Sequence, residues 1–302
     1  MNSCCVALVC DAGYAAQARF VSDQIAAAGN CSFDTLICSP DDIDPGRNAS
    51  HFKIDVDDFI EDLPANARLN HFTYWRIPAI QALASRYERI VYLDTDVFVG
   101  SGRLHELVNI NLQGAPLAAV LDVHQRARPN RMPREYEALG LTWAPYFNAG
   151  VLVVDGAAWL RRDTIGKVRA AAQECRHALT AHDQSLLNLT FRDDWLEISP
   201  TWNWQFTGKT GFVAEHFSPS LVHFIGGNKI WSSHHEVIPA KYYRVWQRFG
   251  ESAENNIPNG WDAGRSKGLL KFYLKNLWYL RSTLRYLERF PDDLTGIRHY
   301  TP

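Results

Sequence analysis

The chain has 302 residues, of which 46% are hydrophobic and 21% are charged. This composition provides enough apolar material for a full core and excludes an extensively disordered protein. The 31 basic and 33 acidic residues nearly balance, so the chain lacks the overall positive charge that attracts nucleic acid, and we expect no nucleic-acid partner.

The N-terminal segment predicts a buried strand followed by a helix. Residues 5–10 form a continuous apolar run, which is typical of a strand covered on both faces, and residues 14–28 have helical character up to Gly29. The apolar run is interrupted at Asp11, before it reaches the length of a signal peptide or a membrane span. The six cysteines show no metal-binding spacing, which favours reduced thiols. We therefore expect a cytoplasmic protein.

Strands and helices alternate through most of the remaining chain. Residues 89–93, with the sequence RIVYL, form the clearest buried strand. Further strands are expected at 33–38, 51–56, 116–121, 150–154 and 221–225, and helices at 73–84, 157–160, 165–178 and 184–189. This alternation predicts an α/β fold with a mostly parallel central sheet flanked by helices. We expect one domain over residues 1–250 and a C-terminal helical extension over residues 251–302.

A D-x-D motif directly follows the strand at 89–93. Its carboxylates, Asp94 and Asp96, lie at the carboxyl end of a strand, where open α/β sheets bind ligands. Apolar residues flank the motif, so both carboxylates should be buried, and a bound cation would neutralise them. His223 is a candidate third ligand, and a set of carboxylates and imidazole favours Mn²⁺ over Mg²⁺. The alternatives are an acidic surface turn and an ordinary core histidine.

The segment after His223 has the composition of a phosphate-binding loop. Gly226 and Gly227 allow the backbone to approach a ligand closely, and Lys229 supplies a positive charge. A diphosphate is the ligand that this lysine would neutralise.

Six motifs occur in a fixed order over most of the first 231 residues. They are DAGY (11–14), TYWR (73–76), YLDTDV (92–97), YFNAGVL (146–152), HDQSLL (182–187) and the segment 223–231. The ordered set resembles the retaining glycosyltransferases of family 8, which include bacterial lipopolysaccharide galactosyltransferases and glucosyltransferases and glycogenin. The resemblance implies a nucleotide-diphospho-sugar transferase fold of the GT-A type, in agreement with the alternating strands and helices.

The resemblance also implies an activity and a set of site residues. The chain is expected to be a metal-dependent hexosyltransferase that uses UDP-galactose or UDP-glucose and an acceptor that is a glycan or lipid-linked glycan, such as lipopolysaccharide. Metal binding is implied for Asp94, Asp96 and His223. The donor is expected to contact Asp11, Tyr14, Arg76, Asp94, Asp96, Asn148 and Lys229, to which the glycine loop adds Gly226. The reacting centre is expected to contain Asp122, Asp183 and Gln184.

Two mechanisms remain open at the reacting centre. Asp183 is the nearest candidate for the nucleophile of a double displacement, whereas the family's front-face mechanism places Gln184 beside the anomeric carbon. Asp183 could also cap a helix, and Asn148 could be a turn residue before a strand.

The C-terminal segment predicts an amphipathic helix with leucines on one side and a basic opposite side. This pattern is typical of a helix on an anionic membrane, although the leucines could instead pack on the domain. We expect peripheral attachment to the inner face of a membrane. The basic residues are Lys267, Lys271, Lys275, Arg281, Arg285 and Arg289.

Three other functions are compatible with parts of the sequence. A metal-dependent phosphohydrolase can also carry D-x-D after an apolar strand, but near its chain start, whereas Asp94 follows several elements. A non-catalytic sugar-nucleotide-binding protein would keep the same fold. A nicotinamide-binding protein is disfavoured because no GxGxxG follows the first strand. In the stretch 202–209 (WNWQFTGK), Trp202 and Trp204 either stack on an acceptor sugar or belong to the core.

Overall fold

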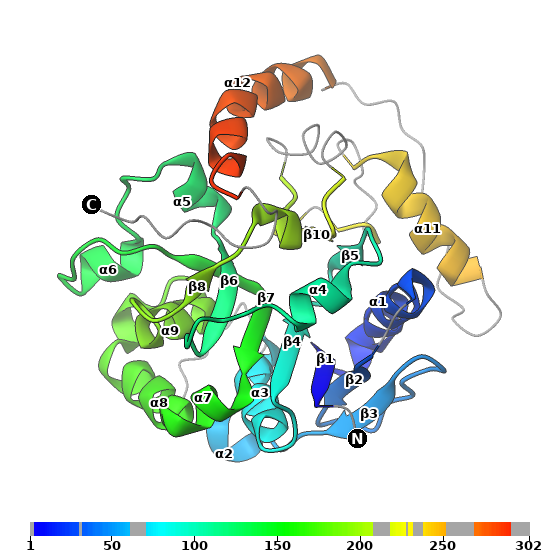
Figure 1. The fold of residues 1–302 in the computed structure, drawn as a ribbon, viewed down its shortest axis with the longest axis horizontal. Helices are drawn as coiled ribbons and strands as arrows, with labels where there is room; N and C mark the ends of the chain where they lie inside the picture. The colour runs from blue at the N-terminus through cyan, green and yellow to red at the C-terminus, as the bar shows by residue number, and fades with distance from the viewer. Residues whose placement is uncertain are drawn as a thin grey trace.

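A computed structural model describes residues 3–29, 32–60, 71–207, 218–227, 229–231, 238–251 and 269–290. A seven-stranded sheet has the order β3-β2-β1-β4-β7-β6-β8, and a three-stranded sheet has the order β5-β10-β9 (Figure 1). The strands are β1 (Cys4–Val9), β2 (Asp34–Ser39), β3 (Ser50–Lys53), β4 (Arg89–Leu93), β5 (Val97–Val99), β6 (Leu117–Leu121), β7 (Phe147–Asp155), β8 (Leu196–Glu197), β9 (Trp204–Gln205) and β10 (Leu221–His223).

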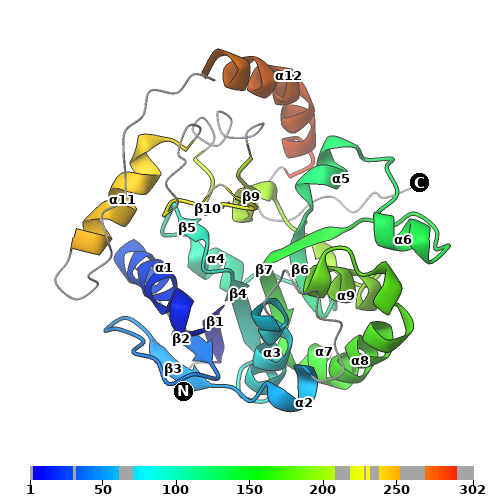
Figure 2. The same cartoon turned by 180° about the vertical axis from the view of Figure 1, so that it is seen from behind.

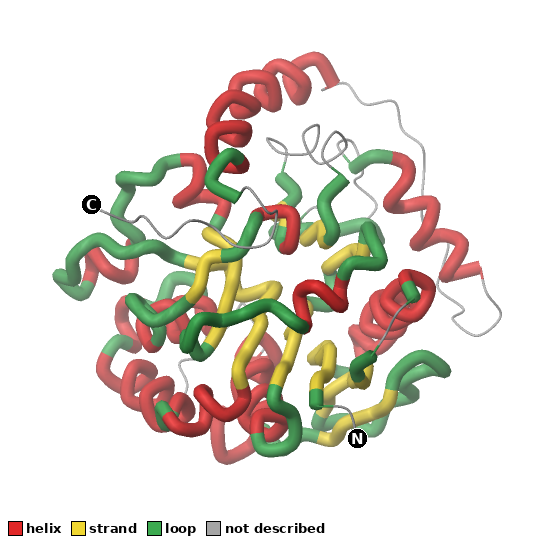
Figure 3. Tube along the Cα trace, in the orientation of Figure 1, coloured by secondary structure: helices red, strands yellow, loops and turns green. Residues whose placement is uncertain are grey.

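Helices surround the large sheet (Figure 3). The α-helices are α1 (Ala15–Ala28), α2 (Asp57–Ile60), α3 (Arg76–Ala84), α4 (Leu104–Val108), α5 (Val123–Ala127), α6 (Arg134–Ala138), α7 (Gly156–Arg161), α8 (Thr164–Glu174), α9 (His182–Thr190), α11 (Ala240–Glu251) and α12 (Leu269–Leu287). Short 3-10 helices are η1 (Ala12–Tyr14), η2 (His71–Trp75), η3 (Arg176–Ala178) and η4 (Pro200–Trp202).

The central strands are apolar on both faces because each face carries its own hydrophobic core. In β1, Val6 and Leu8 belong to one core cluster, and Ala7 and Val9 belong to the other. The first cluster is covered by α1, α4 and the small sheet, and the second by α3, α7, α8 and α9 (Figure 2). This arrangement confirms the α/β fold that the sequence predicts, with a central sheet between helices.

One strand direction differs from a fully parallel arrangement. The pairs β1–β2, β1–β4, β2–β3 and β6–β8 are parallel, whereas β7 runs antiparallel to both β4 and β6. The start of β7 therefore lies at the same sheet edge as the carboxyl ends of β1, β4 and β6. That edge collects Asp11, Asp94, Asp122 and Asn148 from four separate parts of the chain.

The two C-terminal helices pack on the body of the protein. In α11, the rings of Trp246 and Tyr242 lie 5.0 Å from Phe20 and 4.9 Å from Phe98, respectively. In α12, Tyr286 is buried and donates a hydrogen bond to Glu197 of β8. Within the described part of the chain, none of the helices combines the length and the apolarity that crossing a membrane requires.

The side chains of α12 are only partly described. Leu280 and Leu287 pack against the core, whereas Leu274, Leu277 and Leu284 are exposed. The leucines are thus divided between two sides of the helix, and the exposed ones lie on the same side as Arg281 and Arg285, which are also exposed. Lys267 and the side chains of Lys271 and Lys275, which the sequence analysis placed on the basic side, lie outside the described residues.

Candidate active site

Three potential metal ligands meet where the two sheets join. Asp94 follows β4, Asp96 precedes β5, and β10 pairs antiparallel with β5 so that His223 lies opposite Val97. This register brings Asp94, Asp96 and His223 together, with one ligand atom of each within 4.8 Å of the others. These three candidate ligands are named the metal cluster. His223 Nε2 lies 3.0 Å from Asp96 Oδ1 and 3.6 Å from Asp94 Oδ2.

The donor atoms of this cluster fit a divalent cation. Among the residues that the structure describes, none donates a hydrogen bond of good geometry to the buried Asp96 Oδ1, which leaves it available as a ligand. Burial opposes ionisation of Asp96, but the charges of His223 and Lys229 outweigh it and hold the pKa of this carboxyl well below its usual value. Two carboxylates and one imidazole nitrogen suit Mn²⁺, and Mg²⁺ accepts the oxygen ligands.

Asn203, which none of the six sequence motifs includes, orients the imidazole of His223. Its Oδ1 lies 3.1 Å from His223 Nδ1, so Nδ1–H donates to the amide oxygen and Nε2 faces the carboxylates. Asn203 is fully buried, and its Nδ2 donates to Asn148 Oδ1 at 2.9 Å. The signal in the sequence is a buried amide within the aromatic stretch WNWQF.

We expect the substitution Asn203→Leu to lower Mn²⁺ affinity about 10- to 100-fold, because the imidazole loses the partner that fixes its tautomer. Titration calorimetry with Mn²⁺ alone measures the effect. Asn109→Leu is the matched control, since Asn109 is exposed at the end of α4 and its amide nitrogen donates to the carbonyl oxygen of His105. Parent-like Mn²⁺ affinity in Asn203→Leu would contradict the orienting role.

Arg76 connects the metal cluster to the helix that carries Asp183. This buried arginine begins α3, and its Nη2 lies 3.1 Å from Asp94 Oδ1 while its Nε lies 2.8 Å from Asp183 Oδ2. Its Nη1 donates to the carbonyl oxygen of Ala149 at 2.6 Å. Tyr92, also missed by the sequence analysis, donates to Asp94 Oδ1 at 2.5 Å. Asp94 is therefore held in place from two sides.

Asp183 lies inside the first turn of α9. The residue at the N-cap position is Ala181, which excludes the alternative that Asp183 caps this helix. The sequence predicts that this helix begins at residue 184, whereas α9 begins at His182, whose backbone is left-handed with φ of 52°. Burial raises the pKa of Asp183 to about 6; the charge of Arg76 opposes this shift and the charge of Asp94 adds to it.

The raised pKa of Asp183 predicts a pH-dependent difference in stability between the parent and Asp183→Asn. When the pKa of a carboxyl is higher in the folded state than in the unfolded state, the group stabilises the folded state most at a pH below its unfolded-state pKa. This stabilisation is lost as the pH rises through the folded-state pKa. Between about pH 4 and pH 7.5, the free energy of unfolding of the parent should therefore fall by about 2 kcal/mol relative to Asp183→Asn. Urea unfolding with chelator present measures this difference, and a constant difference would contradict it.

A series of hydrogen bonds links the metal cluster to Gln184 and Asp122. Gln184 Oε1 accepts bonds from Asn148 Nδ2 and from the backbone N–H of Ala149, both at 3.1 Å. Gln184 Nε2 donates to Asp122 Oδ2 at 3.4 Å, and Asp122 Oδ1 caps α5 by accepting from His124 N at 2.8 Å. The series therefore runs in the order His223, Asn203, Asn148, Gln184 and Asp122.

The predicted donor residues Asp11 and Tyr14 follow β1, the parallel neighbour of β4. Asp11 Oδ1 accepts from Tyr14 N at 2.9 Å and caps η1. The Tyr14 ring is partly exposed and lies 5.7 Å from the Phe72 ring and 6.5 Å from the Trp231 ring. This aromatic group includes one residue from the segment that follows β10.

The loop after β10 carries Gly226 and Lys229, as expected. Gly226 has φ of 67°, a left-handed conformation that favours glycine. Lys229 Nζ donates to Asp96 and to the carbonyl oxygen of Phe224. The positive charge of this lysine is thus beside the metal cluster.

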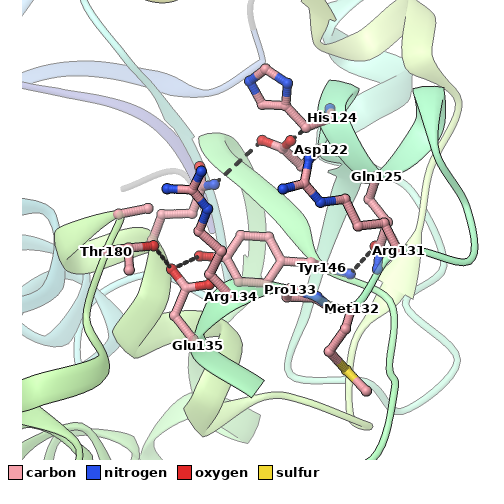
Figure 4. A pocket seen from close by; sticks show the side chains of 12 residues that line it. Asp122, His124, Gln125, Arg131, Met132, Pro133, Arg134, Glu135, Tyr146 and Thr180 are labelled. Atoms are coloured by element: carbon pink, nitrogen blue, oxygen red, sulfur yellow. Dashed lines mark hydrogen bonds between the residues drawn. The ribbon is translucent and has the colours of Figure 1, made fainter. Parts of the chain in front are cut away.

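A pocket of about 500 Å³ opens beside Gln184, and Asp122 and Tyr146 are among the residues that line it (Figure 4). Trp202 and Trp204 are fully buried in the core, so they form no platform on which an acceptor sugar could stack. Of the two alternatives that the sequence leaves open for these tryptophans, the structure supports membership of the core.

Comparisons with known proteins agree with this geometry. Residues 9–235 match the model of Glycosyl transferase family 8. Glycosyltransferase GlyF of Streptococcus pneumoniae is 27% identical over 183 residues, which make up 59% of this chain and 42% of GlyF. Lipopolysaccharide 1,2-glucosyltransferase of Escherichia coli is 27% identical over 199 residues, 62% of this chain and 57% of that enzyme. The chain thus spans less than two thirds of either relative.

A similar solved structure supports the fold assignment. The crystal structure of galactosyltransferase LgtC in complex with donor and acceptor sugar analogs has a TM-score of 0.67 and 20% sequence identity, and the match covers 84% of this chain and 98% of LgtC. The likeness identifies the GT-A fold that the sequence predicts.

Proposed function

The chain belongs to glycosyl transferase family 8, and on this basis we propose that it is a metal-dependent retaining hexosyltransferase using UDP-galactose or UDP-glucose. One observation carries the proposal: the cluster of Asp94, Asp96 and His223 is connected by hydrogen bonds to Gln184 beside a pocket. A donor on the metal side and an acceptor in the pocket would meet at Gln184. Family membership favours this function over the phosphohydrolase alternative.

The metal site serves the departing diphosphate in this proposal. Mn²⁺, or Mg²⁺, bound by Asp94, Asp96 and His223 supplies positive charge that stabilises the UDP leaving group. Lys229, which lies against Asp96, adds a second positive charge on the same side. Asp11 and Tyr14 are proposed to hold the nucleoside at the neighbouring strand end, while Gly226 lets the backbone approach the diphosphate.

The contacts of Asp183 favour the front-face mechanism. Its carboxylate is paired with Arg76 at 2.8 Å, which reduces its reactivity as a nucleophile. Gln184 is held by Asn148 and Ala149 through its amide oxygen, so its amide nitrogen faces Asp122 and the pocket. We assign Gln184 and Asp122 to the positioning of the sugar and the acceptor hydroxyl, and Arg76 and Asp183 to the support of this geometry.

Release of UDP from a panel of UDP-sugars tests the proposal. The parent protein is assayed with Mn²⁺, with Mg²⁺ and with chelator, and release from one hexose donor only with metal is expected. A protein that binds a UDP-sugar without turnover would be the non-catalytic binding protein. No binding and no release with any UDP-sugar would contradict the transferase assignment.

We also propose that α12 places the enzyme on an anionic membrane surface, beside a lipid-linked glycan acceptor. Leu274, Leu277 and Leu284 have exposed fractions of 59%, 54% and 39% and follow one side of the helix. Exposed Arg281 and Arg285 lie among them, so this side combines apolar anchors with positive charge. Residues 1–250 would then form the catalytic domain and residues 251–302 the membrane-facing extension, in the cytoplasm.

Replacing Leu274, Leu277 and Leu284 together with serine should abolish sedimentation with vesicles that contain anionic phospholipid, because the apolar anchors are lost. These side chains are exposed, so the contact between Tyr286 and Glu197 is retained. Leu160→Ser is the matched control, since Leu160 is 40% exposed on α7. Equal sedimentation of the parent and the triple variant would refute membrane attachment through this surface.

A further inference from the structure

Two arginines line the pocket beside Gln184, and the mechanism above assigns them no role. Arg131 lies in the segment between β6 and β7, and Arg134 begins α6 three positions later. Figure 4 shows both side chains in the pocket wall together with Asp122. The pocket thus has guanidinium groups on the wall formed by this segment and the reacting centre on another.

The carboxylates of this pocket are already engaged by neutral donors. Glu135 is buried and accepts hydrogen bonds from the hydroxyl groups of Thr180 at 2.5 Å, Ser185 at 2.7 Å and Tyr146 at 3.3 Å. Asp122 accepts from the backbone of α5 and from Gln184. Neither carboxylate forms an ion pair with an arginine of the pocket, among the residues that the structure describes.

The two guanidinium groups are available to a ligand. Across the described ranges of the chain, neither Arg131 nor Arg134 has a side-chain hydrogen bond or an ion pair. Guanidinium groups bind phosphate and carboxylate with two parallel hydrogen bonds, so a pair of them in one wall selects an anion. The pocket volume of about 500 Å³ is within the usual range for a site that holds a small ligand.

We propose that the acceptor is an anionic sugar, whose phosphate or carboxylate group binds Arg131 and Arg134 while its hydroxyl lies at Gln184. This inference rests on the proposed transferase function and adds the chemical class of the acceptor. Arg131 and Arg134 then determine acceptor specificity, and they take no part in breaking the bond between the sugar and UDP.

Matched acceptor sugars test this specificity. A neutral methyl hexoside, the corresponding hexose phosphate and the corresponding uronic acid are each supplied with Mn²⁺ and the UDP-sugar that the parent hydrolyses. The kcat/KM for one charged acceptor should exceed that for the neutral one by about tenfold or more, as expected for charge-assisted hydrogen bonds. Whichever charged acceptor has the higher kcat/KM, the hexose phosphate or the uronic acid, identifies the anion that the pocket binds. Added salt should reduce the difference in kcat/KM between this acceptor and the neutral one.

In the double variant Arg131→Gln with Arg134→Gln, the kcat/KM for the charged acceptor divided by the kcat/KM for the neutral acceptor should be close to one. The ratio is the readout because a general loss of activity lowers both values equally. Arg161→Gln, an exposed arginine at the end of α7 outside the pocket, is the matched control and should keep the parent ratio. The proposal would be overturned if the parent protein had similar kcat/KM values for charged and neutral acceptors, or if the double variant kept the parent's ratio of these values.

The same experiment separates this proposal from the proposed function. Absence of UDP release from every UDP-sugar would contradict the transferase function. If UDP is released but no sugar accepts the hexose, saturation-transfer NMR with UDP and Mn²⁺ measures binding of the three sugars. Stronger binding of a charged sugar, lost in the double variant, would support the proposal, and equal or absent binding of all three would refute it.

Discussion

Asp96→Ala is expected to lower transfer by about a thousandfold or more, because it removes a proposed metal ligand and an anionic partner of Lys229. In the structure this carboxylate contacts both His223 and Lys229, so its loss leaves the ammonium group of Lys229 without this anion and His223 without one of its two carboxylate neighbours. Gln184→Ala should keep a measurable fraction of activity, since the metal cluster and the leaving-group contacts stay in place.

Rates of transfer and Mn²⁺ affinities of both variants measure this difference. Asp193→Ala is the matched control, because Asp193 is an exposed carboxylate whose ion-pair partner is the neighbouring Arg192 at 3.4 Å. Small and equal losses in Asp96→Ala and Gln184→Ala would mean that neither residue has the role assigned to it.

Gly150→Ala is expected to lower both Mn²⁺ affinity and transfer by about a hundredfold or more through a steric effect. A Cβ at Gly150 would overlap His223 Cε1 and lie 2.9 Å from Asp94 Oδ2. The backbone of Gly150 cannot shift to relieve the overlap, since its carbonyl accepts from Asp94 N at 2.8 Å and its N–H donates to Asn148 Oδ1 at 3.1 Å. The imidazole must therefore turn away from the carboxylates.

Mn²⁺ titration and thermal unfolding of Gly150→Ala separate the site effect from a general loss of structure. The variant should remain folded, with a loss of stability of about 1–3 kcal/mol, which is typical of an overpacked position. Parent-like metal affinity would show that His223 is not held against β7 in the way that the structure indicates.

The sequence was most informative where local pattern and burial coincide. The strand RIVYL was predicted with the bounds that β4 has, and the two aspartates that follow it lie close to His223. The direction of β7 was not predictable, because a strand buried on both faces has the same apolar run whether its neighbours are parallel or antiparallel. For Asn148, only the resemblance to the family implied a contact with the donor.

Other features depend on contacts between distant parts of the chain. Asn203 resembles any amide in an aromatic stretch until the pairing of β9 with β10 places it against His223. The membership of Trp202 and Trp204 in the core is likewise a property of the folded chain. The helix α9 begins at His182, two residues before the predicted start at residue 184. The sequence does not predict the left-handed backbone conformation of His182.

The hydrogen-bonded series from His223 to Asp122 also limits how this enzyme could diversify. Each amide in it is both donor and acceptor, so replacing one member leaves a buried partner unsatisfied on either side. Mutations along the series should be epistatic, and a substitution at one position would persist in a lineage only with a compensating change beside it. New acceptors are more readily acquired through the pocket wall that contains Arg131 and Arg134, because that wall can mutate without disturbing the series.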